Sequence, residues 1–227
     1  DFVPSRGLGD VYKRQGAPKI KVKAVKGYGA EVYLCENNEK SREETCNNII
    51  QKTNANFIHP FDNEDVICGQ ATCAKEIYDT TNDLDFIMCP VGGGGLASGT
   101  VLSTKLFSSR TKVVLAEPLN ASDAYESFTK KTLIPVQSPN TIADGLKTSL
   151  SERTFNIILN GASNIITVTE EEIISAMRLI WERLKIVCEP SCSVPLAALL
   201  KEPKEFKNKK VVIILTGGNV DVQKLPF

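Results

Sequence analysis

The sequence has a single histidine, His59, and equal numbers of basic and acidic residues, so its net charge is zero. One histidine disfavours a Ser-His-Asp hydrolase or a metal site built from several histidines. A neutral balance gives no basic face, so we expect no nucleic-acid partner. No stretch approaches the roughly 18 apolar residues of a membrane span, and no signal-peptide core occurs near the start. We therefore expect no membrane partner.

Cysteines are present, but without a pattern that forms a framework. There are seven, an odd number, and no Cys-x-x-Cys pair occurs. Most lie in apolar segments, so we expect buried, reduced thiols in a cytoplasmic protein and neither a disulfide nor a zinc framework. Residues 1–15 have no apolar period and match nothing that follows. We favour a non-native scar for these residues, with a native disordered arm as the alternative.

The dominant feature is a run of four glycines, Gly92–Gly95, between apolar stretches at 84–88 and 100–107. This order predicts a strand, a glycine loop and a helix. Such a loop can turn its backbone N–H groups inward, and at a helix N-terminus these donors attract an anion, usually a phosphate. A flexible linker is the alternative. A dinucleotide fingerprint with Glu117 as its acid fits only loosely, and no P-loop lysine follows.

Predicted strands and helices alternate along the chain, which favours an α/β fold with an open, mostly parallel sheet flanked by helices. Strands are expected at 31–35, 56–58, 84–88, 112–118, 165–168 and 211–215. Helices are expected at 41–53, 64–78 and 100–107, and two more begin near 169 and 188. Near 18–26 we favour a short helix, with a strand as the alternative. Ser41, with Glu44, and Thr169 are predicted helix caps.

Three turns end strands or begin helices, at 92–95, 189–191 and 216–219. Ligands bind at the carboxyl ends of the strands in open parallel sheets, so we expect these turns to converge. These motifs resemble those of fold-type-II pyridoxal-phosphate enzymes, in particular serine racemases and serine/threonine dehydratases. The resemblance spans residues 17–221 and includes Tyr28-Gly29-Ala30, Gly69-Gln70, 90–96, Glu117-Pro118, Ala143-Asp144-Gly145, 168–170, Glu189-Pro190 and 216–221.

The resemblance implies a fold like that of the tryptophan synthase β-subunit. Residues 16–58 would be the remnant of a small domain, and 59–227 a large cofactor-binding domain. It also implies pyridoxal 5'-phosphate as the cofactor. Its phosphate would be held by the backbone of Gly92, Gly93, Gly94, Gly95 and Leu96. Thr216 would face the pyridine nitrogen, and Phe61 would lie near the ring, where some relatives have Asn.

Glu117 and Asp123 flank a turn that contains Ala121. Two carboxylates and a carbonyl suit a hard cation, although on spacing alone a capped helix with a solvated acid is simpler. The stretch resembles the metal loop of serine racemases. That resemblance implies magnesium or calcium at Glu117, the Ala121 carbonyl and Asp123, with Asp85 at a metal-associated position.

Tyr28, Lys185 and Asn219 match positions that bind a nucleotide effector in some animal racemases. For Lys185 we favour a simpler role as partner of a helix dipole. The Ser-x-Lys-x-Arg-Gly motif of the Schiff-base lysine and the Ser-Gly-Asn-His motif are both missing. The catalytic residues are therefore unknown. We expect a C-terminal part of an enzyme, inactive by itself.

In the full-length enzyme, expected to be a homodimer, the resemblance implies removal of the Cα proton of L-serine or L-threonine by a lysine. Loss of the hydroxyl would then give a 2-oxo acid and ammonia, and reprotonation from the opposite face would give racemisation. Racemase and dehydratase stay open alternatives. The rival hypothesis is a non-catalytic phosphate- or nucleotide-binding module of Rossmann-like build.

Overall fold

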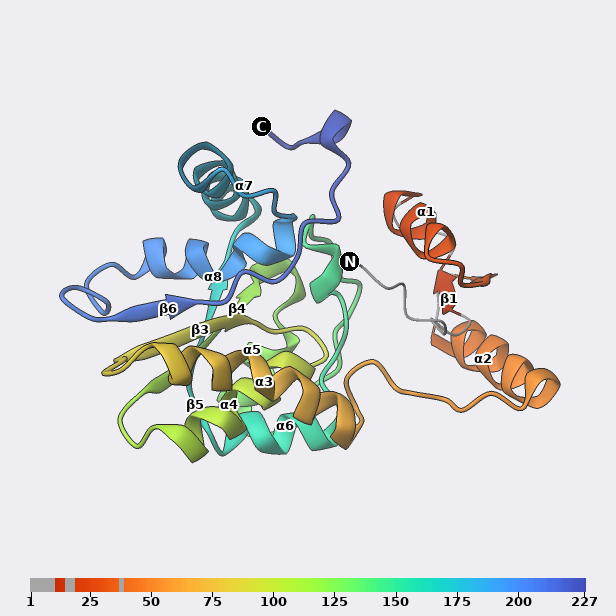
Figure 1. Ribbon diagram of the computed structural model, residues 1–227, viewed down its shortest axis with the longest axis horizontal. Coiled ribbons are helices and arrows are strands. Elements are labelled where there is room, and N and C mark those ends of the chain that lie inside the picture. Colours follow the sequence, from red (N-terminus) through yellow and green to blue (C-terminus); the bar gives the residue numbers. More distant parts are fainter. Residues whose placement is uncertain (1–10, 15–18, 37–38) are drawn as a thin grey trace. The chain divides into compact units, whose positions relative to one another are not determined.

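The computed structural model describes residues 11–14, 19–36 and 39–227 (Figure 1). The chain divides into two units. The first contains the described residues up to Ile58 together with Asn219–Leu225, and the second contains His59–Gly218 with Pro226–Phe227.

The second unit is built on a four-stranded parallel sheet in the order β5-β4-β3-β6. Phe86 pairs with Lys112 on one side and with Val211 on the other. The strands are β3 (Phe86–Pro90), β4 (Lys112–Pro118), β5 (Ala162–Val168) and β6 (Val211–Ile213). The predicted α/β class with an open parallel sheet is confirmed.

Helices cover both faces of this sheet (Figure 1). One apolar cluster joins one face of the strands to α3, α4, α5 and α6, and a second joins the opposite face to α7 and α8. Alternate residues of β3 and β4 enter the two clusters, which makes both strands almost wholly apolar. The helices are α3 (Glu64–Thr80), α4 (Gly95–Phe107), α5 (Asp123–Lys130), α6 (Glu152–Leu159), α7 (Glu170–Leu179) and α8 (Pro190–Lys201).

Short helical turns complete the second unit at the ends of these elements. They are the 3-10 turns η1 (Leu119–Ala121) and η2 (Asp144–Leu146) and the π-helical turn η3 (Ile180–Leu184). Thr169 caps α7 as predicted, because its hydroxyl accepts the Glu172 amide while the Glu172 carboxylate accepts the Thr169 amide. No described helix is both long enough and apolar enough to cross a membrane.

The first unit contains a parallel pair of strands and two helices. Strand β1 (Val11–Arg14) pairs with β2 (Val32–Cys35), and the helices are α1 (Lys19–Gly27) and α2 (Glu39–Thr53), with a 3-10 turn η4 (Val222–Lys224). The helix favoured near 18–26 is confirmed. Of the arm expected at 1–15, residues 1–10 and 15 lie outside the described residues. Residues 11–14 form a strand, because their backbone pairs with β2.

Two local predictions in the first unit are wrong. Ser41 is not the cap of α2, since the helix already begins at Glu39 and the Ser41 hydroxyl accepts the amide of Glu36. Residues 56–58 form no strand, and Phe57 and Ile58 are largely exposed. An isolated apolar triplet is too short to form a stable strand unless another strand pairs with it.

Helices α3 and α4 approach each other at a glycine. A Cβ atom at Gly99 would lie 2.6 Å from the Ala71 amide nitrogen, whereas one at Gly69 would meet nothing within 4 Å. We expect Gly99→Ala to lower the free energy of unfolding by about 2 kcal/mol, because the clash involves backbone. Gly69→Ala should raise it by up to about 1 kcal/mol through helix propensity. Urea unfolding of both variants checks this, and equal effects would contradict the close approach.

Candidate functional site

The predicted strand, glycine loop and helix are all present. Gly94 is the N-cap of α4 and has φ = +90°, a conformation that favours glycine. Helix α4 begins at Gly95, and Leu96 is its second residue. The first amides of a helix have no intrahelical acceptor, so the N-terminus of α4 presents donors suited to an anion.

The loop is enclosed by neighbouring segments on the sides where side chains would stand. A Cβ atom at Gly93 would lie 2.3 Å from the Phe61 ring, and one at Gly94 would lie 2.7 Å from Thr154. A Cβ atom at Gly92 would lie 3.1 Å from the Leu146 Cα atom. Side chains at Gly93 and Gly94 would therefore clash with their surroundings, and Gly92 is tightly packed, so the loop consists of bare backbone.

The three turns expected to converge do lie together at the carboxyl edge of the sheet. Gly92 packs against residues 145–146, and the Gly145 amide donates to the Ser191 hydroxyl over 3.1 Å. The Glu189 amide donates to the Gly217 carbonyl over 2.9 Å. A continuous set of contacts thus joins the glycine loop, the start of α8 and the turn that holds Thr216.

A buried thiol lies beside Thr216. Cys192 is buried within the first turn of α8. A hydrogen bond from the Cys188 thiol lowers the pKa of Cys192, assisted by the amides of Gly217 and Thr216 and by the Thr216 hydroxyl. The same bond, together with burial, raises the pKa of Cys188, so Cys192 is the thiol of the pair that ionises first. No motif in the sequence indicates a role for Cys192.

Two acidic residues are buried at the carboxyl end of β4. Glu117 accepts the amides of Ala124 and Tyr125 over 3.0 and 2.9 Å, so it caps the start of α5. Burial nevertheless raises the pKa of Glu117 to about 9. Burial likewise raises the pKa of Asp123 to about 7, against the weaker attraction of its own amide and that of Leu150. Neither carboxylate oxygen of Asp123 accepts a hydrogen bond of good geometry.

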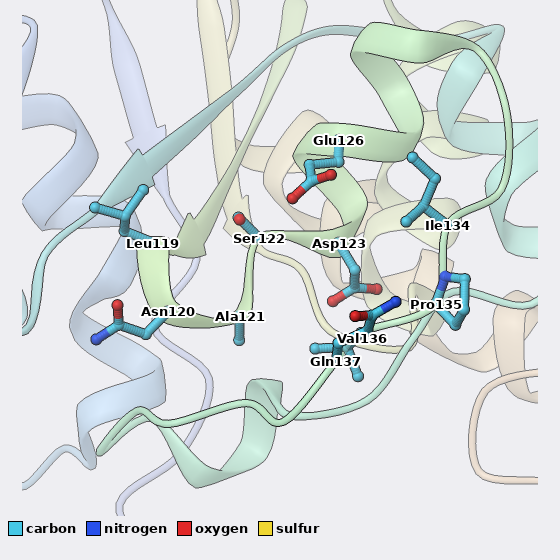
Figure 2. Close-up of a pocket in the computed structure, with 10 residues that line it drawn as sticks. All are labelled: Leu119, Asn120, Ala121, Ser122, Asp123, Glu126, Ile134, Pro135, Val136 and Gln137. Carbon is cyan, nitrogen blue, oxygen red and sulfur yellow. The ribbon is translucent and has the colours of Figure 1, made fainter.

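Asp123 borders a cavity of about 300 Å³. Figure 2 shows its side chain pointing between the turn that holds Ala121 and the segment 134–137. Within the described parts of the chain, no group of three or more His, Cys, Asp or Glu side chains is arranged for a metal. A cation here would need carbonyl oxygens and water besides the two carboxylates, which is the donor set that magnesium and calcium accept. The orphaned Asp123 carboxylate fits such an ion.

Asp85 does not join this group. It precedes β3, at the amino edge of the sheet, whereas Glu117 and Asp123 lie at the carboxyl edge. Its carboxylate accepts the Lys210 amide over 2.9 Å and pairs with Arg110 at 3.5 Å. We therefore remove Asp85 from the expected metal site.

The expected effector residues are divided between the two units. Tyr28 and Asn219 belong to the first unit, and Lys185 to the second. The Lys185 amino group donates to the Glu182 carbonyl over 2.6 Å. This contact with the end of a helix fits the dipole role favoured for Lys185.

Comparison with known proteins gives a consistent set of relatives. The family model described as pyridoxal-phosphate dependent enzyme matches residues 10–217. The β-hydroxyaspartate dehydratase of Paracoccus denitrificans is 44% identical over 211 residues, covering 93% of this chain and 67% of that protein. The serine racemase of Dictyostelium discoideum is 45% identical over 217 residues, covering 93% of this chain and 66% of that protein.

The structure of maize serine racemase superposes with a TM-score of 0.91 at 32% identity, covering 94% of this chain and 67% of that chain. The chain thus spans about two thirds of the length of these relatives.

The buried carboxyls predict an unusual pH dependence of stability without divalent cations. The folded-state pKa values of Asp123 and Glu117 lie above the ordinary 3.8 and 4.5, so the folded chain binds more protons than the unfolded chain up to about pH 7 and 9. Stability from these groups is therefore fully present at low pH and falls as pH rises. In chelator, we expect the melting temperature to drop by several degrees between about pH 5 and 8.

Asp123→Asn is the matched control, because it keeps the shape of the side chain without the titration. This variant should lose the part of the decline below about pH 7 and should be at least as stable as the wild type at pH 8. A wild-type melting temperature that rises steadily over the same interval would contradict the raised pKa values.

Proposed function

Because the chain belongs to the pyridoxal-phosphate dependent enzymes, we propose that it forms the cofactor-binding part of a racemase or ammonia-lyase acting on 2-amino-3-hydroxy acids. The observation that carries this proposal is the Cβ-free loop at the N-terminus of α4, joined by direct contacts to the turns at 189–191 and 216–218. The rival hypothesis, a non-catalytic Rossmann-like module, has no support from relatives that are racemases and dehydratases.

The loop is proposed to hold the cofactor phosphate through the backbone of Gly92–Gly95 and Leu96. Thr216, at the end of the β6 segment, would offer a neutral hydroxyl to the pyridine nitrogen, with Cys192 behind it. Phe61, which packs on Gly93, would border the ring. When bound, pyridoxal phosphate supplies an electron sink for the charge left when the Cα proton is removed.

The proposed substrate class follows from what the named relatives share. Serine and β-hydroxyaspartate both carry an amino group at Cα and a hydroxyl at Cβ. L-Serine and L-threonine are our first candidates, and β-hydroxyaspartate is the acidic alternative. Removal of the Cα proton followed by loss of the β-hydroxyl gives elimination, whereas return of a proton to the opposite face gives racemisation.

The cavity bordered by Asp123 and Ala121, here called the acidic cavity, is proposed as a magnesium or calcium site. Its ligands would be Asp123, the Ala121 carbonyl and Glu117, which is buried and does not itself line the cavity. The burial of the two carboxylates supports a bound cation. Glu117 is fully buried, and Asp123 is buried with both of its carboxylate oxygens lacking a good hydrogen bond. An ionised carboxylate has about four acceptor positions, and the two α5 amides occupy only two of those on Glu117. A cation would then fix the turn η1 at the end of β4.

The purified chain should bind pyridoxal phosphate but form no detectable 2-oxo acid from L-serine, because it lacks the Ser-x-Lys-x-Arg-Gly motif. A version extended by a segment that carries this motif should develop a visible absorption band that borohydride traps. Robust pyruvate formation by the 227-residue chain would show that another residue performs the lysine's chemistry.

Divalent cations should raise the melting temperature, since a ligand that binds only the folded state stabilises it by mass action. At 100 times the dissociation constant the gain is about 2.7 kcal/mol. Asp123→Asn should abolish the gain, whereas Asp83→Asn, an exposed acid paired with Arg110, should retain it. If magnesium and calcium leave the wild-type melting temperature unchanged, the turn is a simple capped helix start.

A further inference from the structure

The first turn of α6 lies directly against the glycine loop. Ser151 is the N-cap of this helix, and its hydroxyl accepts the Thr154 amide over 3.2 Å. The Thr154 hydroxyl accepts the Ser151 amide over 3.0 Å in return. This capping box fixes the Thr154 side chain, which is fully buried.

The hydroxyl of Thr154 also reaches the loop. It donates to the Gly93 carbonyl over 2.9 Å, across 61 positions of sequence. A hydroxyl has one proton to donate, and the Ser151 amide occupies one of its acceptor positions, so both interactions are compatible. A longer contact to the Ser151 carbonyl, at 3.3 Å, competes for the same proton less favourably.

This bond sets the direction of one loop amide. Carbonyl and N–H point in opposite directions across a planar trans peptide. Anchoring the Gly93 carbonyl on Thr154 therefore aims the Gly94 N–H away from α6. Gly94, the next residue, has φ = +90°, and a Cβ there would lie 2.7 Å from the Thr154 Cβ atom, so only glycine fits beside Thr154.

Arg153, the residue before Thr154, contacts the segment that covers the glycine loop on another side. The Arg153 guanidinium pairs with Asp62 at 3.1 Å and with Glu64. Asp62 follows Phe61, whose ring covers Gly93 and whose Cβ lies against Gly95. Two consecutive residues of α6 thus reach the loop itself and the segment that covers it.

We propose that Thr154 and Arg153 are positioning residues for phosphate recognition: Thr154 aims the Gly94 amide, and Arg153 holds the Phe61 segment over the loop. The inference rests on the proposed phosphate-binding function of the loop. Neither residue is assigned contact with the cofactor. Their effect should therefore depend on the phosphate group of the ligand.

The test uses the 227-residue chain and two probes without an aldehyde, so that surface lysines cannot react. The probes are 4'-deoxypyridoxine 5'-phosphate and 4'-deoxypyridoxine, measured by equilibrium dialysis. The wild type should bind the phosphorylated probe more tightly. Thr154→Val should weaken that binding about tenfold, the effect of one well-formed hydrogen bond, and leave the other probe unchanged. Thr154→Ser should restore it.

Two matched controls separate positioning from stability. Ser151→Ala weakens the same helix cap but keeps the Thr154 hydroxyl, so it should lower the melting temperature without changing the phosphate preference. Arg153→Gln leaves the core intact and should weaken phosphorylated-probe binding about threefold. Arg178→Gln, which breaks the exposed pair with Glu182, should not.

The outcomes are distinguishable. If the wild type shows no preference for the phosphorylated probe, the proposed phosphate site fails, and this inference fails with it. If the wild type shows the preference and both Thr154→Val and Arg153→Gln keep it, the phosphate site stands and the positioning roles are wrong. If Ser151→Ala loses the preference as much as Thr154→Val, the helix cap and not the Gly93 bond is responsible, which also overturns the proposal.

Discussion

Side chains at Gly93 and Gly94 would clash with the segments that surround the glycine loop, and the site depends on this steric constraint. Phe61 and Thr154 stand where the missing Cβ atoms of Gly93 and Gly94 would be, and the backbone of Leu146 packs tightly against Gly92. Glycine in a fixed conformation costs more backbone entropy than any other residue. Packing contacts with Phe61, Thr154 and Leu146 offset part of that cost. Bare amides at a helix N-terminus are the donors that suit a phosphate.

At the acidic cavity, in contrast to the glycine loop, the buried groups lower the stability of the fold. A buried polar group without a hydrogen bond costs about 1–3 kcal/mol, and Asp123 has two such oxygens. Glu117 is satisfied in part by the amides of α5, so its burial alone has a structural explanation. Within the described chain, no hydrogen bond of good geometry to Asp123 explains its burial in the same way. That difference makes Asp123, more than Glu117, the residue that favours a bound cation at this turn.

The sequence was most informative where the structural signal is local. The glycine loop, the alternation of strands and helices and the Thr169 cap are each specified by a few neighbouring residues, and each is confirmed. Ser41 and the triplet 56–58 failed, because the same local patterns also fit a turn and an exposed connection. Asp85 was assigned to the metal site by resemblance alone, although it immediately precedes one strand, whereas Glu117 lies near the end of the parallel neighbouring strand.

The role of Thr154 was missed for a related reason. Ser151 and Thr154 have the spacing of a helix cap, so the start of α6 was within reach of sequence analysis. The bond from Thr154 to Gly93 was not, since it joins residues far apart in the chain. Long-range side chain to backbone contacts leave no periodic trace in a single sequence.

The same short segment connects the two candidate sites. The Leu150 amide attracts the Asp123 carboxylate beside the acidic cavity. The Leu150 side chain stands 2.8 Å from where a Gly94 Cβ would be, next to Thr154. Residues 150–154 therefore form one wall of the glycine loop and part of the surroundings of Asp123. Interiors this closely packed leave little room for one wall to move alone, so the two candidate sites share a structural support.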